Sequence, residues 1–127
     1  TYRMIRSLSP HALISFKQGA NGDEDFSAPE RGGAKRVGTQ LEVANLVYEK
    51  NKNKLKEICN TLQPHSWGYN KANDGEHKKA AEVLQMLADA EAQNANLLLN
   101  VGPLPDGSFP EEDINTLIEV GKKFKSK

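Results

Sequence analysis

Residues 96–101 of the chain read Asn-Leu-Leu-Leu-Asn-Val and end at Gly102, which a proline follows. A short apolar run bounded by turn residues is typical of a parallel strand that is covered on both faces. Residues 12–16 show the same pattern. Residues 57–62 alternate more weakly and stop before Pro64, which cannot continue a central strand. We therefore expect three parallel strands.

Helical patterns alternate with these strands. Residues 77–93 form the clearest helix, whose apolar stripe consists of Ala80, Val83, Leu84, Leu87 and Ala88. Helices are also predicted over residues 2–8, over residues 39–48 behind a capping box, and from residue 110 onward, where proline and acidic residues fill the first turn. Strands that alternate with helices in this way predict an α/β architecture with parallel strands.

The predicted elements do not make a complete sheet. A parallel sheet of three strands leaves two edges unpaired and needs cover on both faces. The first element is a helix with no strand before it. Residues 18–38 form a long loop rich in Gly, Asp and Pro, a feature that more often marks a functional loop than a neutral connector. We expect the chain to be the carboxyl-terminal portion of a larger α/β body.

Charge and composition argue against several classes of protein. The 127 residues include 17 Lys or Arg and 17 Asp or Glu, so the formal net charge is zero. Proteins that bind nucleic acid or anionic membranes show a basic excess or a basic face, and we expect neither partner. No apolar stretch approaches the roughly 18 residues of a membrane span. Cys59 is the only cysteine, so it cannot form a disulfide within the chain.

Two glutamates are the candidates for acid/base chemistry. Glu57 opens a predicted strand among apolar residues, where a carboxyl group keeps its proton more readily, as a general acid must near neutral pH. The alternative for Glu57 is a salt bridge to a nearby lysine, at position 54 or 56. Glu30 lies in the long loop, and its alternative is an ion pair with Arg31.

Other chemistry has weaker support. Trp67 and Tyr69 flank a glycine and suit a platform for a sugar face, although such a pair more often belongs to a core. The three histidines are widely separated, and Cys59 has no CxxC partner, so we expect no metal. Residues 102–107 lack the lysine and the glycine spacing of a phosphate-binding loop, and we expect no cofactor.

Several motifs together resemble the α-L-fucosidases, glycoside hydrolase family 29. Residues 96–107, NLLLNVGPLPDG, resemble the signature at the last barrel strand of that family. Residues 57–59 (EIC) followed by residues 66–69 (SWGY) resemble its preceding strand. Residues 14–19 and 25–30 are similar to a bacterial branch. The resemblance runs along nearly the whole chain, and the combination of motifs is specific.

This resemblance implies a TIM-like (β/α) barrel, of which the chain supplies about the last three strand–helix units. It also implies hydrolysis of terminal α-L-fucosyl residues of oligosaccharides or glycoconjugates with retention of configuration. An aspartate attacks the anomeric carbon, and a second carboxylate protonates the leaving oxygen and then activates water. In many members the acid/base glutamate matches Glu57, and in other branches it matches Glu30. Trp67 and Tyr69 would shape the sugar pocket.

The resemblance also implies that part of the site is missing. The family's nucleophilic aspartate and the histidines that grip fucose lie in an amino-terminal half that this sequence does not match. We therefore expect activity only when that half, or another copy of the chain, completes the site. Two alternatives stay open: a non-catalytic sugar-binding or scaffold fragment, and a stand-alone α/β domain that shares only ancestry with the family.

Overall fold

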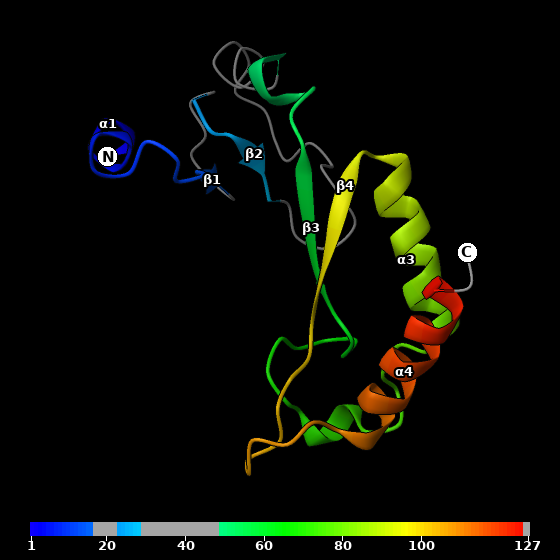
Figure 1. Cartoon of the computed structure of the whole chain (residues 1–127). Coiled ribbons are helices and arrows are strands. Elements are labelled where there is room, and N and C mark those ends of the chain that lie inside the picture. Colours follow the sequence, from blue (N-terminus) through cyan, green and yellow to red (C-terminus); the bar gives the residue numbers. More distant parts are fainter. Residues whose placement is uncertain (17–22, 29–48, 126–127) are drawn as a thin grey trace.

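The computed structural model describes residues 1–16, 23–28 and 49–125. Its elements run in the order α1 (Tyr2–Leu8), β1 (Ser15–Phe16), β2 (Phe26–Ser27), β3 (Lys56–Thr61), the short 3₁₀ helix η1 (Lys71–Asn73), α3 (Ala80–Ala92), β4 (Ala95–Asn100) and α4 (Glu111–Lys125), as Figure 1 shows. No helix among these described residues is long and apolar enough to cross a membrane.

The four strands form one parallel sheet in the order β1-β2-β3-β4. Strands β3 and β4 pair along their whole length, from Lys56 opposite Ala95 to Thr61 opposite Asn100. Strand β2 meets β3 only where Ser27 lies opposite Lys56. The carboxyl ends of β3 and β4, Thr61 opposite Asn100, lie at one edge of the sheet, the lower edge in Figure 1, whereas β2 ends beside the first residue of β3. We call this edge the carboxyl rim.

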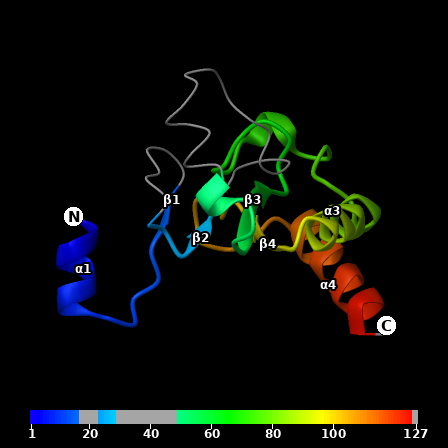
Figure 2. The same ribbon diagram turned by 90° about the horizontal axis from the view of Figure 1, so that it is seen from above.

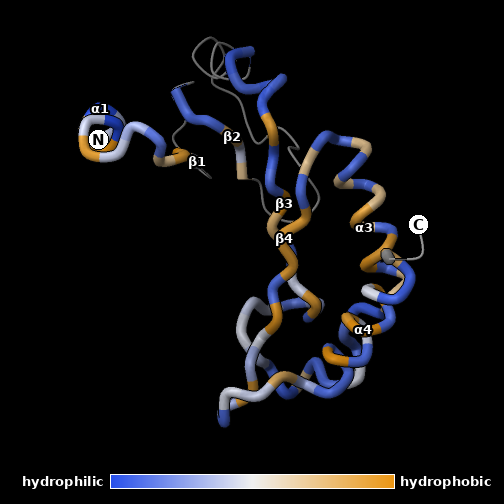
Figure 3. The backbone as a smooth tube through the Cα atoms, in the orientation of Figure 1, coloured by the Kyte–Doolittle hydropathy of each residue, from blue (hydrophilic) through white to orange (hydrophobic). Residues whose placement is uncertain are grey.

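Helices α3 and α4 lie together on one side of the β3–β4 pair (Figures 1 and 2). Figure 3 shows hydrophobic segments on β4 and on both helices. The buried core consists of Leu62, Ala80, Val83 and Val120, with Leu84, Leu87, Leu99 and Val101 packed against it. The odd-numbered residues of β4 therefore face α3.

The other face of the β3–β4 pair is open in the described part of the chain. Side chains alternate between the faces of a strand, so Asn96 and Leu98 point away from α3. Both are exposed, and Leu98 retains 50% of its accessible surface. Glu57 and Cys59 of β3 share this open face by the same alternation. The described residues therefore cover one face of this pair, and the expected cover of the second face is not supplied by them.

Helix α1 is tied to the segment that enters β2. The Tyr2 hydroxyl donates to Glu24 Oε1 at 2.9 Å, and the Glu24 side chain is buried. Asp25 accepts a hydrogen bond from the Ile14 amide at 2.7 Å and forms an ion pair with Arg6 at 3.2 Å. The Ile14 amide, and secondarily Arg6, lower the pKa of Asp25 against the opposing effect of partial burial. These contacts hold β2 beside β1.

Most predicted elements are present with shifted bounds. Helix α1 and strands β3 and β4 agree with the prediction within one residue. Helix α3 begins at Ala80 rather than residue 77, because the Lys79 amide donates to Glu82 Oε2 at 3.0 Å and so caps the first turn. Strand β1 is shorter than residues 12–16.

One strand was not predicted. Strand β2 lies inside the long predicted loop, and its two residues carry no apolar run. Its pairing with Ser15 and Phe16 defines it, which is a long-range contact that a local pattern does not reveal. The helix predicted over residues 39–48 lies outside the described residues.

Candidate active site

Two loops extend from the carboxyl rim: residues 62–79 follow β3, and residues 101–110 follow β4 (Figure 1). In parallel α/β folds, binding and catalytic groups gather at this edge of the sheet. The predicted sugar platform, Trp67 and Tyr69, lies in the first loop. The structure therefore puts the two aromatic residues at the edge where a site is expected.

Gln63 organises the first loop. Its side chain is completely buried, and its Oε1 accepts a hydrogen bond from the Asn70 amide at 2.9 Å. The Ser66 hydroxyl lies within hydrogen-bonding distance of the same oxygen, at 3.0 Å, and of the Gly68 carbonyl, at 2.7 Å. These bonds fold residues 66–70 into a tight turn that carries both aromatic side chains.

Asn100, the last residue of β4, joins this turn to the sheet. Its side-chain Nδ2 donates to the Trp67 carbonyl at 2.7 Å and to Thr61 Oγ1 at 3.1 Å. A side-chain amide has two N–H donors, and both are used here. The backbone of Trp67 is therefore held by the ends of β3 and β4 at once.

Gly102 lets the two rim loops approach each other closely. A Cβ at this position would lie 2.4 Å from Gln63 Nε2, 2.6 Å from the Tyr69 backbone nitrogen and 2.9 Å from the Gly68 carbonyl carbon. Real Cβ contacts are longer than this, so only glycine fits without movement of the first loop.

Tyr69 points its hydroxyl at an acid within the same loop. The hydroxyl donates to Asp74 Oδ2 at 3.2 Å. Burial of the ring, followed by the hydrogen bond to Asp74 and its negative charge, raises the pKa of Tyr69. The one hydroxyl proton is directed at Asp74, which leaves the phenol oxygen as an acceptor.

A buried histidine fastens the first loop to α4. His77 Nδ1 lies 2.6 Å from Asp113 Oδ1, and both side chains are completely buried. The neighbouring Glu112 accepts from the Gly75 amide at 2.8 Å and pairs with Lys79 at 3.1 Å. Partial burial raises the pKa of Glu112, but these two contacts outweigh it and lower that pKa overall.

Among the described residues, one group of side chains has the composition and spacing to hold a metal ion. Asp74, His77 and Glu112 can bring one ligand atom each within 4.8 Å of one another. His77 Nδ1 is already bonded to Asp113, and Glu112 to Gly75 and Lys79. Because these atoms are engaged in bonds that join the loop to α4, we assign the group a structural role.

The two candidate acids differ in how they can be placed. Glu57 is the second residue of β3, half-buried, and lies opposite Asn96 near the start of β4. It is therefore at the amino end of its strand, whereas the acid/base role that we predicted requires the carboxyl rim. Glu30 lies outside the described residues, three positions after Ser27, with which β2 ends.

The lysines near Glu57 have other contacts. Lys56 Nζ donates to the Gln93 carbonyl at 3.3 Å, and Lys54 Nζ donates to the Glu24 carbonyl. Both acceptors are main-chain oxygens. These bonds fix the lysines at the amino edge of the sheet, on the far side from Trp67.

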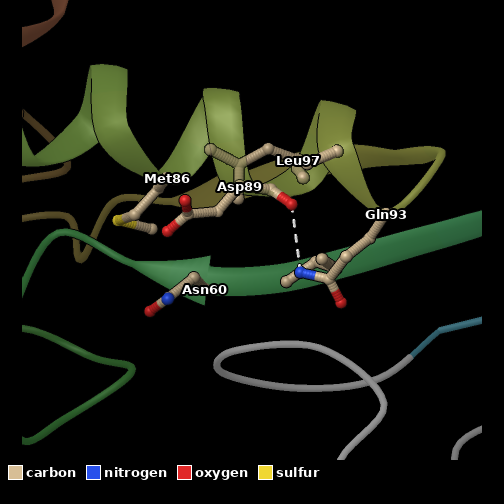
Figure 4. A pocket seen from close by; sticks show the side chains of 8 residues that line it. Asn60, Met86, Asp89, Gln93 and Leu97 are labelled. Carbon is tan, nitrogen blue, oxygen red and sulfur yellow. Dashed lines mark hydrogen bonds between the residues drawn. The ribbon is translucent and has the colours of Figure 1, made fainter.

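A pocket of about 310 Å³ lies between α3 and the strands (Figure 4). Met86 and Asp89 of α3 and Gln93, which follows this helix, line it together with Asn60 and Leu97 of the strands, and Gln93 Nε2 donates to the Asp89 carbonyl at 3.0 Å. Asp89 is its one ionisable residue, so the pocket cannot supply a pair of carboxylates. It lies on the helix side of the sheet, and we assign it to helix packing.

Sequence reasoning missed Gln63 and Asn100 as residues that hold the site. Both are amides that follow or end an apolar strand, and no local pattern separates them from solvated polar residues. Their location at the end of a predicted strand could have identified them, because the last residues of parallel strands lie at the edge of the sheet where sites form.

Comparison with known proteins gives a consistent result. The profile of the family described as Alpha-L-fucosidase matches residues 2–127. A Caenorhabditis elegans protein assigned as an alpha-L-fucosidase is 42% identical over 67 residues, which are 52% of this chain and 14% of that protein. The plasma alpha-L-fucosidase of Rattus norvegicus is 36% identical over 70 residues, 54% of this chain and 15% of that protein.

Solved structures give the same family. Alpha-L-fucosidase isoenzyme 1 from Paenibacillus thiaminolyticus is similar with a TM-score of 0.74 and 32% identity, over 97% of this chain and 29% of that one. The alpha-fucosidase of Thermotoga maritima, at 22% identity, has a similar fold with a TM-score of 0.68, over 95% of this chain and 24% of that one. The chain thus spans less than a third of either structure.

Proposed function

The chain belongs to the α-L-fucosidase family, and from this premise we propose that it supplies the carboxyl-terminal part of a retaining α-L-fucosidase barrel. The substrate class is a terminal α-L-fucosyl residue of an oligosaccharide or glycoconjugate. The observation that carries the proposal is the family match over residues 2–127 together with the aromatic loop at the carboxyl rim.

The one-sided sheet supports the barrel. In a (β/α) barrel the helices form an outer ring, and the other face of each strand turns inward. The arrangement of α3 and α4 on one side, and the half-exposed Leu98 on the other, fits an inner face that more strands would close. We propose the amino-terminal part of the barrel as that partner, with a second copy of the chain as the alternative.

We propose Glu30, rather than Glu57, as the acid/base. Glu57 lies four residues before the end of β3, which is roughly 13 Å along the strand at ~3.3 Å per residue. In retaining enzymes the two carboxyl groups are only about 5–5.5 Å apart across the sugar. A sugar bound beside Trp67 at the rim is therefore out of reach of Glu57. Glu30 is the alternative that the family resemblance gives, and it follows Ser27, which lies opposite Lys56, by three residues.

We assign the aromatic residues to the sugar pocket. A half-buried indole offers an apolar surface to the C–H face of a sugar, and Tyr69 offers a hydroxyl oxygen that can accept a hydrogen bond while its proton is directed at Asp74. The nucleophilic aspartate belongs to the part of the barrel that this chain does not supply. The chain alone is expected to bind fucose weakly or not at all and not to turn over.

The test is the leaving-group dependence of hydrolysis by a complete catalytic domain that contains this chain. A general acid protonates the departing oxygen, so its loss affects poor leaving groups most. We expect Glu30→Gln to lower kcat/KM by about 10²–10⁴ for an alkyl α-L-fucoside and far less for a dinitrophenyl α-L-fucoside.

Glu57→Gln is the matched control and is expected to show no such split. The opposite result, with the split in Glu57→Gln alone, would return the role to Glu57. If the complete domain shows no fucosidase activity, calorimetric titration with L-fucose tests the remaining candidate, a non-catalytic sugar-binding fragment.

A further inference from the structure

We propose that Asn100 is a positioning residue for Trp67: its side-chain amide fixes the backbone of the aromatic loop at the carboxyl rim before a ligand binds. The identity of the ligand, a fucoside, rests on the proposed function. The positioning itself rests on contacts within the described residues.

The first contact gives the amide a fixed orientation. Asn100 Nδ2 donates to Thr61 Oγ1 at 3.1 Å, and Thr61 is 1% exposed. Thr61 lies directly opposite Asn100 in the paired strands, so this acceptor is a rigid part of the sheet. The remaining N–H of the amide consequently points in one direction, toward the Trp67 carbonyl at 2.7 Å.

Two more contacts hold the loop from other sides. Gln63 Oε1 accepts the Asn70 amide, which closes the turn behind Trp67. Gly102 lies so close to Gly68 and Tyr69 that the turn cannot slide toward the second loop. The turn that carries Trp67 is therefore held at three places, while the Trp67 side chain remains half-buried.

This arrangement serves binding because it lowers the cost of ordering the platform. A loop that is already held in its bound conformation loses little conformational freedom when a ligand arrives. A Trp67 ring that is carried by a rigid turn also keeps the bound sugar at a fixed position relative to the catalytic carboxylates. Loss of the Asn100 donor is therefore expected to weaken substrate binding more than it slows the chemical step.

Trp67 provides the test, because it is the only tryptophan of the chain. Asn100→Asp has the same shape but removes both donors and puts a carboxyl oxygen against the Trp67 carbonyl. Asn96→Asp is the matched control, since Asn96 lies on the same face of β4 at its other end. The measurement is acrylamide quenching of Trp67 fluorescence in the 127-residue chain, with far-UV circular dichroism to confirm that folded proteins are compared.

We expect Asn100→Asp to raise the quenching constant by about twofold or more and Asn96→Asp to leave it unchanged. Equal quenching in the parent and both variants would overturn the proposal. If Asn100→Asp does not fold, Thr61→Val replaces it: this near-isosteric change removes the anchor of the amide and is expected to raise quenching less. No change in Thr61→Val would then overturn the proposal.

A second measurement separates this proposal from the proposed function. In the complete catalytic domain, Asn100→Asp is expected to raise KM for an aryl α-L-fucoside about tenfold, with kcat within about twofold of the parent. A fall in kcat alone would contradict a positioning role. If the parent domain is inactive, the proposed function fails, whereas the quenching comparison still decides whether Asn100 holds Trp67.

Discussion

The contact between the rim loops gives a sharp prediction for Gly102→Ala. The added Cβ would lie 2.6 Å from the Tyr69 nitrogen and 2.9 Å from the Gly68 carbonyl carbon, and both of these are backbone atoms. Inserting one methyl group into a packed region costs typically about 1–3 kcal/mol. We expect about 3 kcal/mol here, because the backbone of the Trp67 loop must move and a side-chain rotation cannot relieve the contact.

Urea unfolding measures this cost as a lower midpoint with an unchanged slope. The control is Gly68→Ala in the same loop, where a Cβ would meet no atom within 4 Å. The control is expected to stay within about 0.5 kcal/mol of the parent. If Gly102→Ala unfolds at the same urea concentration as Gly68→Ala, the close approach of the two loops is refuted.

The remaining predictions concern stability. Leu62→Ala should lower the free energy of unfolding in urea by about 2–5 kcal/mol, because Leu62 is completely buried. Leu98→Ala should lower it by less than about 0.5 kcal/mol in the 127-residue chain, because Leu98 is half-exposed. Equal losses would contradict the one-sided sheet. The pKa of Asp25 is lower in the folded than in the unfolded state. The stabilisation that its carboxylate provides is therefore present above about pH 4 and is lost as the pH falls through the folded pKa. The difference in free energy of unfolding between the parent and Asp25→Asn should shrink on acidification from about pH 6 to pH 2. Gly121→Ala should raise the free energy of unfolding by roughly 0.5–1 kcal/mol, because the residue lies inside α4 and its new Cβ would meet no atom of another segment within 4 Å. Thermal melts of both proteins measure the effect. A lower melting temperature of the variant would contradict the prediction.

The local patterns of the sequence predict the long elements well. Strand β4 and helix α4 have clear start and stop signals: an apolar run before a glycine–proline pair, and a proline with acids in the first turn. Strand β2 has no such signal, because two residues cannot show a period and their pairing depends on contacts with β1 and β3. The cover of each face also depends on tertiary contacts, so an apolar run predicts that a strand is buried but not which part of the protein covers it.

The sequence singles out residue types for the candidate site, and the structure adds where they lie. The aromatic pair at Trp67 and Tyr69 stands out in the sequence, and it lies at the carboxyl rim. Glu57 has an equally prominent sequence context, and the structure puts it at the start of β3, at the opposite end of the strand from the carboxyl rim. The distinction depends on where the strand begins, and strand ends are the boundaries that sequence patterns define least well.

The bond between His77 and Asp113 has a consequence for how the chain acquires its shape during synthesis. The two residues are 36 positions apart, and Asp113 lies in the first turn of α4. Until residue 113 has been synthesised, the hydrogen bond between His77 and Asp113 cannot form, and the segment around His77 is not yet attached to α4. Premature termination upstream of residue 111 would therefore remove more than the last helix, because Gly75, His77 and Lys79 of the first loop would lose their partners in α4.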